Sequence, residues 1–174
     1  MDSRARAFLL KASSNRPGII AMKITEALFA EHVVFHNLFD HIESTLPNIK
    51  TLAEVKTMAS IMEAMLKGHS DTEDDLFIGP LEHCFEQIGQ RDGFIDEHRE
   101  IDGSLREVQE ATRMDQARRM LLQAVRYSRV HFDKEERVVF PMAERLLKEE
   151  TLESLGKAWM NQRTRISPAV MAVV

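Results

Sequence analysis

The sequence predicts an all-α protein that folds as an antiparallel up-down four-helix bundle with short extra helices. Apolar residues recur with helical periodicity in four stretches, and no strand-like alternation persists. The composition is rich in Glu, Lys, Arg, Leu and Met and poor in Gly and Pro, which favours helix. Four long helices with short connections pack most simply as an up-down bundle, with each apolar stripe facing the common axis.

The first two helices are expected in the first half of the chain. The first should begin after Asn15, with Pro17 in its first turn. The second should begin near Thr51 and stop before Gly79-Pro80, because proline cannot continue a helical hydrogen-bond ladder. A short helix is expected to follow, over residues 81–88.

The third helix is expected to start around Asp92, and the fourth at Asp115, a residue type favoured as a helix N-cap. The fourth stripe includes Val138, and Pro141 should kink or divide this helix. A last amphipathic helix is expected over residues 152–163. The predicted organisation is an N-terminal extension (1–15), the bundle with its C-terminal helix (16–163) and a flexible tail (164–174).

Composition excludes several classes of protein. The net charge is −5 and no dense basic patch occurs, so nucleic acid is not an expected partner. No apolar stretch reaches the length of a membrane span, and the apolar run at residues 7–10 is too short for a signal-peptide core. The single cysteine, Cys84, is compatible with a reducing compartment. We therefore expect a cytoplasmic protein that does not bind membranes.

Each of the four apolar stripes is interrupted near its middle by polar side chains, all of them histidine or glutamate. These are His32 in the first stripe, His69 and Glu73 in the second, His98 in the third, and His131 and Glu135 in the fourth. Both His–Glu pairs are spaced i, i+4, so the two members project from one helix face. Counting about 100° per residue around the helix axis, the acidic neighbours Asp74 and Glu136 point well away from the histidines of their helices. The carboxylates are therefore assigned to Glu73 and Glu135.

Burying four imidazoles and two carboxylates without partners is very costly, and the stripes offer few Lys or Arg residues at this level. Two cations would satisfy all six side chains, with the carboxylates bridging them, two imidazoles on each, and a bridging oxide or hydroxide. Nitrogen and oxygen ligands without thiolate favour iron or manganese over structural zinc. The chain also repeats itself, since a lone His precedes a His-x-x-x-Glu motif in each half.

The sequence resembles hemerythrin-like (HHE cation-binding) domains over about residues 20–163. The resemblance rests on Glu31-His32, His69-x-x-x-Glu73, Glu97-His98 and the run His131-Phe-Asp-Lys-Glu135-Glu-Arg-Val-Val-Phe-Pro141. It implies an oxo- or hydroxo-bridged pair of non-haem iron ions, although manganese or zinc is compatible with the purified protein. The implied metal ligands are His32, His69, Glu73, His98, His131 and Glu135.

One position departs from the oxygen-carrying members of this family. They have a second histidine one turn after the ligand of the third helix, where this chain has Asp102. Asp102 is therefore a candidate ligand, a hydrogen-bond acceptor near the ligands, or a proton donor to bound oxygen. His36 lies one turn after His32, and we expect it to orient a ligand in preference to binding metal. His41 is expected to be solvated.

Three functions fit these features. The first is a protein that binds O2 or a related ligand such as NO, as a sensor or buffer. The second is a di-iron redox enzyme acting on peroxide, oxygen or ferrous iron. The missing fifth histidine motivates it, because a more open iron favours turnover over reversible binding. The third is an iron-dependent interaction or regulatory module with an unknown protein partner.

Overall fold

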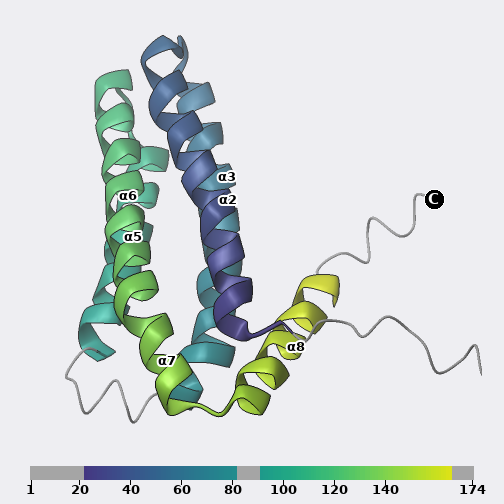
Figure 1. Cartoon of the computed structure of the whole chain (residues 1–174). Helices are drawn as coiled ribbons and strands as arrows, with labels where there is room; N and C mark the ends of the chain where they lie inside the picture. Colours follow the sequence, from purple (N-terminus) through teal and green to yellow (C-terminus); the bar gives the residue numbers. More distant parts are fainter. Residues whose placement is uncertain (1–21, 82–90, 166–174) are drawn as a thin grey trace, which may run out of the picture.

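The computed structural model describes residues 22–81 and 91–165, and every regular element in these ranges is helical. Four long helices lie side by side: α2 (Ile24–Thr45), α3 (Leu52–Glu73), α5 (Arg91–Glu110) and α6 (Met114–Lys134) (Figure 1). A short 3-10 helix, η1 (Leu46–Asn48), joins α2 to α3, and residues 111–113 join α5 to α6. Two antiparallel hairpins therefore pack together, which confirms the predicted bundle.

The apolar stripes form two core clusters within the described chain, one on each side of the level at which the polar residues interrupt them. The larger cluster fills the bundle between the four helices and includes Phe39, Leu105 and Leu121. The smaller one lies at the end where the chain enters α2 and includes Ile24 and Phe77. All five side chains are fully buried. Each such side chain contributes about 1.5–3 kcal/mol of burial free energy.

Both helices that carry a His-x-x-x-Glu motif pass into a π-helical turn. α3 continues into η2 (Asp74–Ile78), and α6 continues into η3 (Glu135–Val139), which α7 (Phe140–Leu146) follows. A π turn contains an extra residue, so it rotates the residues beyond it around the helix axis. Val138, expected on the apolar stripe, is consequently 49% exposed, whereas Val139 is buried.

The two prolines follow these wide turns. The expected stop before Gly79-Pro80 is wrong, because residues 79–81 are helical. A proline in the first turn of a resumed helix breaks no hydrogen bond that the helix needs, since its missing N–H would have no partner there. Pro141 occupies such a position at the start of α7. The expected division of the fourth helix at Pro141 is confirmed, with η3 between its two parts.

One expected helix start and one expected N-cap are wrong. α2 begins at Ile24 and not after Asn15, because Lys23 has an extended backbone and donates its N–H to the Glu26 carboxylate at 2.9 Å. α6 has Arg113 as its N-cap, and Asp115 lies in its first turn. There Asp115 accepts hydrogen bonds from Arg113 at 3.0 and 3.1 Å, and its negative charge suits a helix N-terminus.

Other boundaries agree with expectation. Thr51 caps α3, its hydroxyl accepting the N–H of Glu54 at 3.3 Å. α5 begins at Arg91, next to the expected Asp92. The short helix expected over 81–88 lies outside the described residues except for its first, and so does most of the expected tail. No helix in the described ranges is both long enough and apolar enough to span a membrane.

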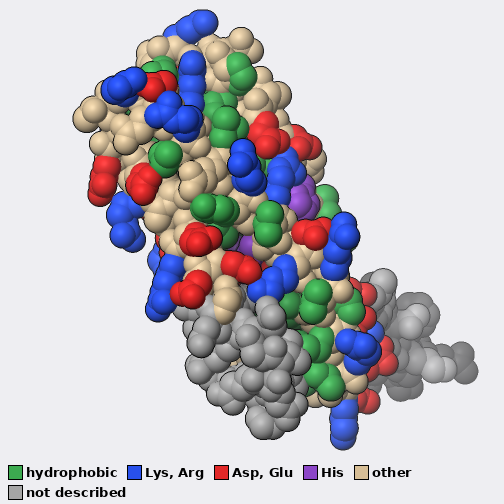
Figure 2. All heavy atoms as spheres, turned by 90° about the vertical axis from the view of Figure 1, so that its left-hand side faces the viewer, with side chains coloured by type: hydrophobic (Ala, Val, Ile, Leu, Met, Phe, Trp, Pro, Cys, Tyr) green, Lys and Arg blue, Asp and Glu red, His purple; other side chains and the backbone are tan. Residues whose placement is uncertain are grey.

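The last helix, α8 (Glu149–Arg165), packs against α2 near the base of the bundle (Figure 1). It is longer than the expected 152–163 and extends into the segment expected as a tail. Gly156 allows this packing, because a Cβ atom there would overlap the carbonyl oxygen of Met22. On the face opposite α8, acidic and basic side chains are interspersed and histidines show only as small areas (Figure 2).

We predict that Gly156→Ala lowers the free energy of unfolding by about 1–3 kcal/mol, because the new methyl group has no room. The better helix propensity of alanine cannot offset this overlap. Gly103→Ala is the matched control, since a Cβ at Gly103 has nothing within 4 Å, and it should raise stability by up to about 1 kcal/mol. Urea unfolding of both variants measures the difference. A Gly156→Ala variant as stable as Gly103→Ala would contradict the packing of α8.

Candidate metal centre

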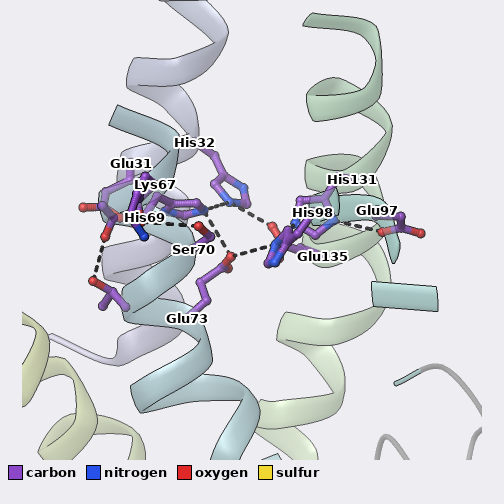
Figure 3. Close-up of polar contacts among 12 residues, drawn as sticks. Glu31, His32, Lys67, His69, Ser70, Glu73, Glu97, His98, His131 and Glu135 are labelled. Atoms are coloured by element: carbon purple, nitrogen blue, oxygen red, sulfur yellow. Dashed lines mark hydrogen bonds and ion pairs between the residues drawn. The ribbon is translucent and has the colours of Figure 1, made fainter. Parts of the chain in front are cut away.

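The structure brings the six predicted ligand residues together at one level of the bundle (Figure 3). α2, α3, α5 and α6 contribute one histidine each, whereas the two glutamates lie where α3 and α6 pass into their π turns. Five of the six side chains are 0–2% exposed, and His98 is 18% exposed. The residues are His32, His69, Glu73, His98, His131 and Glu135. The helical repeat explains this convergence, because i, i+4 pairs share a face.

The six residues fall into two overlapping groups whose potential ligand atoms lie within 4.8 Å of one another. The first group is His32, His69, Glu73 and Glu135, and the second is Glu73, His98 and His131. Glu73 belongs to both groups. Glu135 also faces both, since its two oxygens lie 3.1 Å from His32 Nε2 and 3.2 Å from His131 Nε2. Both carboxylates therefore lie between two sets of histidines that could each hold a cation.

The inward atoms of this cluster face one another at short distances. Both oxygens of Glu73 and both of Glu135 are buried without a hydrogen bond in the described part of the chain. The Nε2 atoms of His32 and His69 lie 3.2 Å apart, and those of His98 and His131 lie 2.9 Å apart. Unsatisfied buried carboxylates cost free energy, and a cation between the facing atoms would satisfy oxygens and nitrogens together. The donor set therefore fits two metal ions.

Three further glutamates, to which the sequence analysis assigned no role, hold the outer nitrogens of the histidines. Nδ1 of His69 donates to Glu31 at 2.8 Å, and Nδ1 of His131 donates to Glu97 at 2.9 Å. A proton fixed on Nδ1 leaves the Nε2 lone pair free for a cation, and it makes the imidazole a better ligand.

Nδ1 of His32 likewise lies 2.9 Å from Glu136. A sequence signal for these partners exists: a glutamate directly precedes each lone histidine, in Glu31-His32 and Glu97-His98. Each of these glutamates serves the histidine of the next helix and not its own neighbour. Glu136 lies outside both ligand groups, as the helical wheel predicted.

The two inner carboxylates differ in pKa. Burial and the adjacent Glu135 carboxylate raise the pKa of Glu73 well above its usual value. Burial would also raise the pKa of Glu135, but His131 and His32 outweigh it and hold that pKa well below the usual value. Burial opposes a charge on His131, yet Glu135 and Glu97 raise its pKa to about 9. Without a metal, a proton therefore stays on His131 at neutral pH.

The other two histidines with shifted pKa values favour their neutral form, which is the form that binds metals. Burial lowers the pKa of His69, and burial together with His131 lowers the pKa of His98 to about 4. The Glu31 carboxylate, against the effect of burial, has its pKa lowered to about 2 by His69 and Arg163. Glu31 is therefore ionised and ready to accept the Nδ1 proton of His69.

His36 and Asp102, the two residues expected beside the ligands, lie outside both groups. His36 Nε2 is 3.6 Å from the Glu136 carboxylate, so it adjoins the partner of His32. Asp102 is exposed and lines a cavity of about 20 Å³ that reaches the second ligand group. Side chains from α3, α5 and α6 line this cavity: Leu66, His69, Ser70, His98, Ile101, Asp102, His131 and Phe132. His41 is exposed, as expected.

Comparison with known families agrees with this geometry. The model of the Hemerythrin HHE cation binding domain matches residues 23–143 and, in a second alignment, residues 91–160. The first range contains all six converging residues, and the second begins at the first helix of the second hairpin. Neither the curated proteins nor the solved structures gave a significant match.

We predict that Glu73→Gln stabilises the metal-free protein and abolishes metal binding. Because the folded-state pKa of Glu73 is raised, its stabilising contribution is present below about pH 4.5 and lost as pH rises through the folded-state pKa. Glutamine has no charge to bury, so the variant should gain about 1–3 kcal/mol at pH 8 and little at pH 4.5.

Urea unfolding of the metal-free proteins at the two pH values measures this gain. Glu63→Gln, which changes an exposed carboxylate on the same helix, should alter stability by less than about 0.5 kcal/mol. A Glu73→Gln variant that is destabilised at pH 8, or that still binds metal with wild-type affinity, would contradict the assignment.

Proposed function

Because the chain belongs to the hemerythrin HHE cation-binding domain family, we propose that it holds two non-haem iron ions and binds O2 or a related small ligand such as NO, as a cytoplasmic sensor or buffer. One observation carries the metal assignment. Four imidazole nitrogens and four carboxylate oxygens that lack hydrogen bonds among the described residues face one another in a largely apolar interior. Cations held between these atoms would satisfy the nitrogens and the oxygens together.

Each of the two ligand groups would hold one of the two ions. His32 and His69 would hold one ion, His98 and His131 the other, and Glu73 and Glu135 would lie between them. The outer glutamates keep the Nδ1 protons in place, so the imidazoles are pre-arranged and a cation meets little reorganisation. Donors of nitrogen and oxygen without thiolate suit iron. When bound, the iron pair would supply redox chemistry.

The surroundings of the second group support a small ligand. His98 is the most exposed of the six residues, and the cavity beside it has a volume of about 20 Å³. A space of this size takes a molecule about as large as water. Leu66, Ile101 and Phe132 supply an apolar lining. These features favour a diatomic or similarly small ligand over an organic substrate.

The experiment begins with protein made in iron-sufficient medium. We expect about two iron ions per chain, one for each ligand group, and the near-ultraviolet absorption of an oxo-bridged diferric centre. A manganese or zinc content would identify another resident metal. The reduced protein mixed with O2 should form a stable adduct that releases O2 under vacuum. Glu73→Gln is the control that should show neither iron nor adduct. Irreversible oxidation of the wild type would count against a binding role.

A redox enzyme is the second candidate, and the position of Asp102 favours it. The Asp102 carboxylate lines the cavity that reaches His98 and His131, so an acid–base group stands beside the space that a small oxidant would enter. The substrate in this case is peroxide, oxygen or ferrous iron. An iron-dependent interaction module, whose protein partner is unknown, stays a third prediction.

We predict that, if the centre is an enzyme, Asp102→Ala loses most of its peroxide consumption and keeps its iron. The reason is that the exposed Asp102 carboxylate takes up a proton from solvent and passes it on as the carboxylic acid in the transition state, an effect worth about 10²–10⁴-fold. Asp96→Ala, on the exposed side of the same helix, is the matched control and should keep its rate. Equal peroxide consumption in both variants would remove Asp102 from the reaction.

A further inference from the structure

Arg163 connects α8 to the bundle close to the candidate metal centre. Its Nε donates to Glu31 Oε1 at 2.6 Å, and its Nη1 donates to the carbonyl of Gly68 at 3.0 Å and to the hydroxyl of Thr72 at 2.9 Å. Glu31 belongs to α2, whereas Gly68 and Thr72 belong to α3. One guanidinium group from the last described helix therefore joins the two helices of the first hairpin.

Through Glu31, Arg163 is linked to the candidate ligand His69. While Oε1 of Glu31 accepts from Arg163, Oε2 accepts from Nδ1 of His69 at 2.8 Å. The Arg163 and Glu31 side chains are only 22% and 19% exposed, so solvent screens their charge-assisted contact less than it screens a surface pair. Glu31 is thus held at both oxygens, and its position fixes the orientation of the His69 ring. Figure 3 shows Glu31 beside His69.

In the second hairpin, a different basic residue holds the glutamate that contacts the histidine. There Glu97 accepts from Nδ1 of His131, and its other oxygen accepts from Lys134 at 2.8 Å. Lys134 belongs to α6, the helix that carries His131 itself. The second hairpin therefore supplies its own basic side chain, Lys134, whereas the first hairpin uses Arg163 of α8. This difference breaks the internal repeat and, among the contacts of the described residues given above, ties the His69 half of the centre to α8.

We propose that Arg163 is a positioning residue through which cation binding at His69 and the docking of α8 stabilise each other. A cation on Nε2 withdraws electron density from the ring and strengthens the bond from Nδ1 to Glu31, which in turn holds Arg163. Two sites coupled in this way influence each other to the same extent in both directions. The inference rests on the proposed metal binding, and it adds that the state of the centre is transmitted to the C-terminal helix.

The experiment uses the full chain with ferrous iron under anaerobic conditions. Competition with a chelator measures iron affinity, and hydrogen exchange followed by mass spectrometry measures protection of residues 157–165. In the wild type, iron should slow exchange in this segment. Arg163→Ala should weaken iron binding by about 10–100-fold and exchange there at the same rate with and without iron. Arg163→Lys, which keeps the charge and loses the forked geometry, should recover part of the affinity.

Two controls separate this coupling from general damage. Lys134→Ala removes the equivalent cation of the second hairpin, so it should weaken iron binding and leave the iron-dependent protection of α8 intact. Arg119→Ala breaks an exposed ion pair with Asp115 and should change neither. Circular dichroism and urea unfolding show that each variant is folded.

The outcomes separate the two proposals. A wild type that binds no ferrous iron overturns the proposed function and this coupling with it. A wild type that binds iron overturns the coupling alone if Arg163→Ala has the same affinity, or if iron still protects residues 157–165 in that variant.

Discussion

Two carboxylates in an apolar interior are the constraint on which the rest of the centre depends. Glu73 and Glu135 are fully buried and lack hydrogen bonds in the described chain. Positive charge must therefore meet them, from cations or from protonated imidazoles. Outward from them the structure places imidazoles, then glutamates such as Glu31 and Glu97, and then Arg163 and Lys134. Acidic and basic groups thus alternate from the axis of the bundle to its surface.

The helices themselves are adapted to this site. Glu73 is the last residue of α3 and Glu135 the first of η3, so both carboxylates stand where an α-helix becomes a π-helix. A π turn in a helix occurs frequently at functional sites. Here it leaves the i, i+4 pairing with His69 and His131 intact and rotates only the residues that follow. The apolar core beyond the site then uses Phe77 and Val139 to close the end of the bundle.

The sequence predicted the six converging residues because their positions depend only on helix periodicity and on which face of each helix is apolar. The repeated Glu-His pairs single out Glu31 and Glu97. Which histidine each of them holds, and the role of Glu136, depend on which helices become neighbours, and the periodicity of a single helix does not show that. Arg163 was missed for the same reason, since it meets Glu31 only through the docking of α8. The errors at Asp115 and Pro80 are local, because each residue type fits more than one position at a helix end.

The dependence of His69 on α8 has a consequence for biosynthesis. Arg163 comes after all six candidate ligands in the chain. The second hairpin has its two histidines, Glu97, Lys134 and Glu135 once Glu135 has left the ribosome. The first hairpin, although synthesised earlier, waits for a residue made later. The half of the centre that is translated first is therefore the half that is completed last, and the nascent chain reaches its mature ligand geometry only after α8 has emerged.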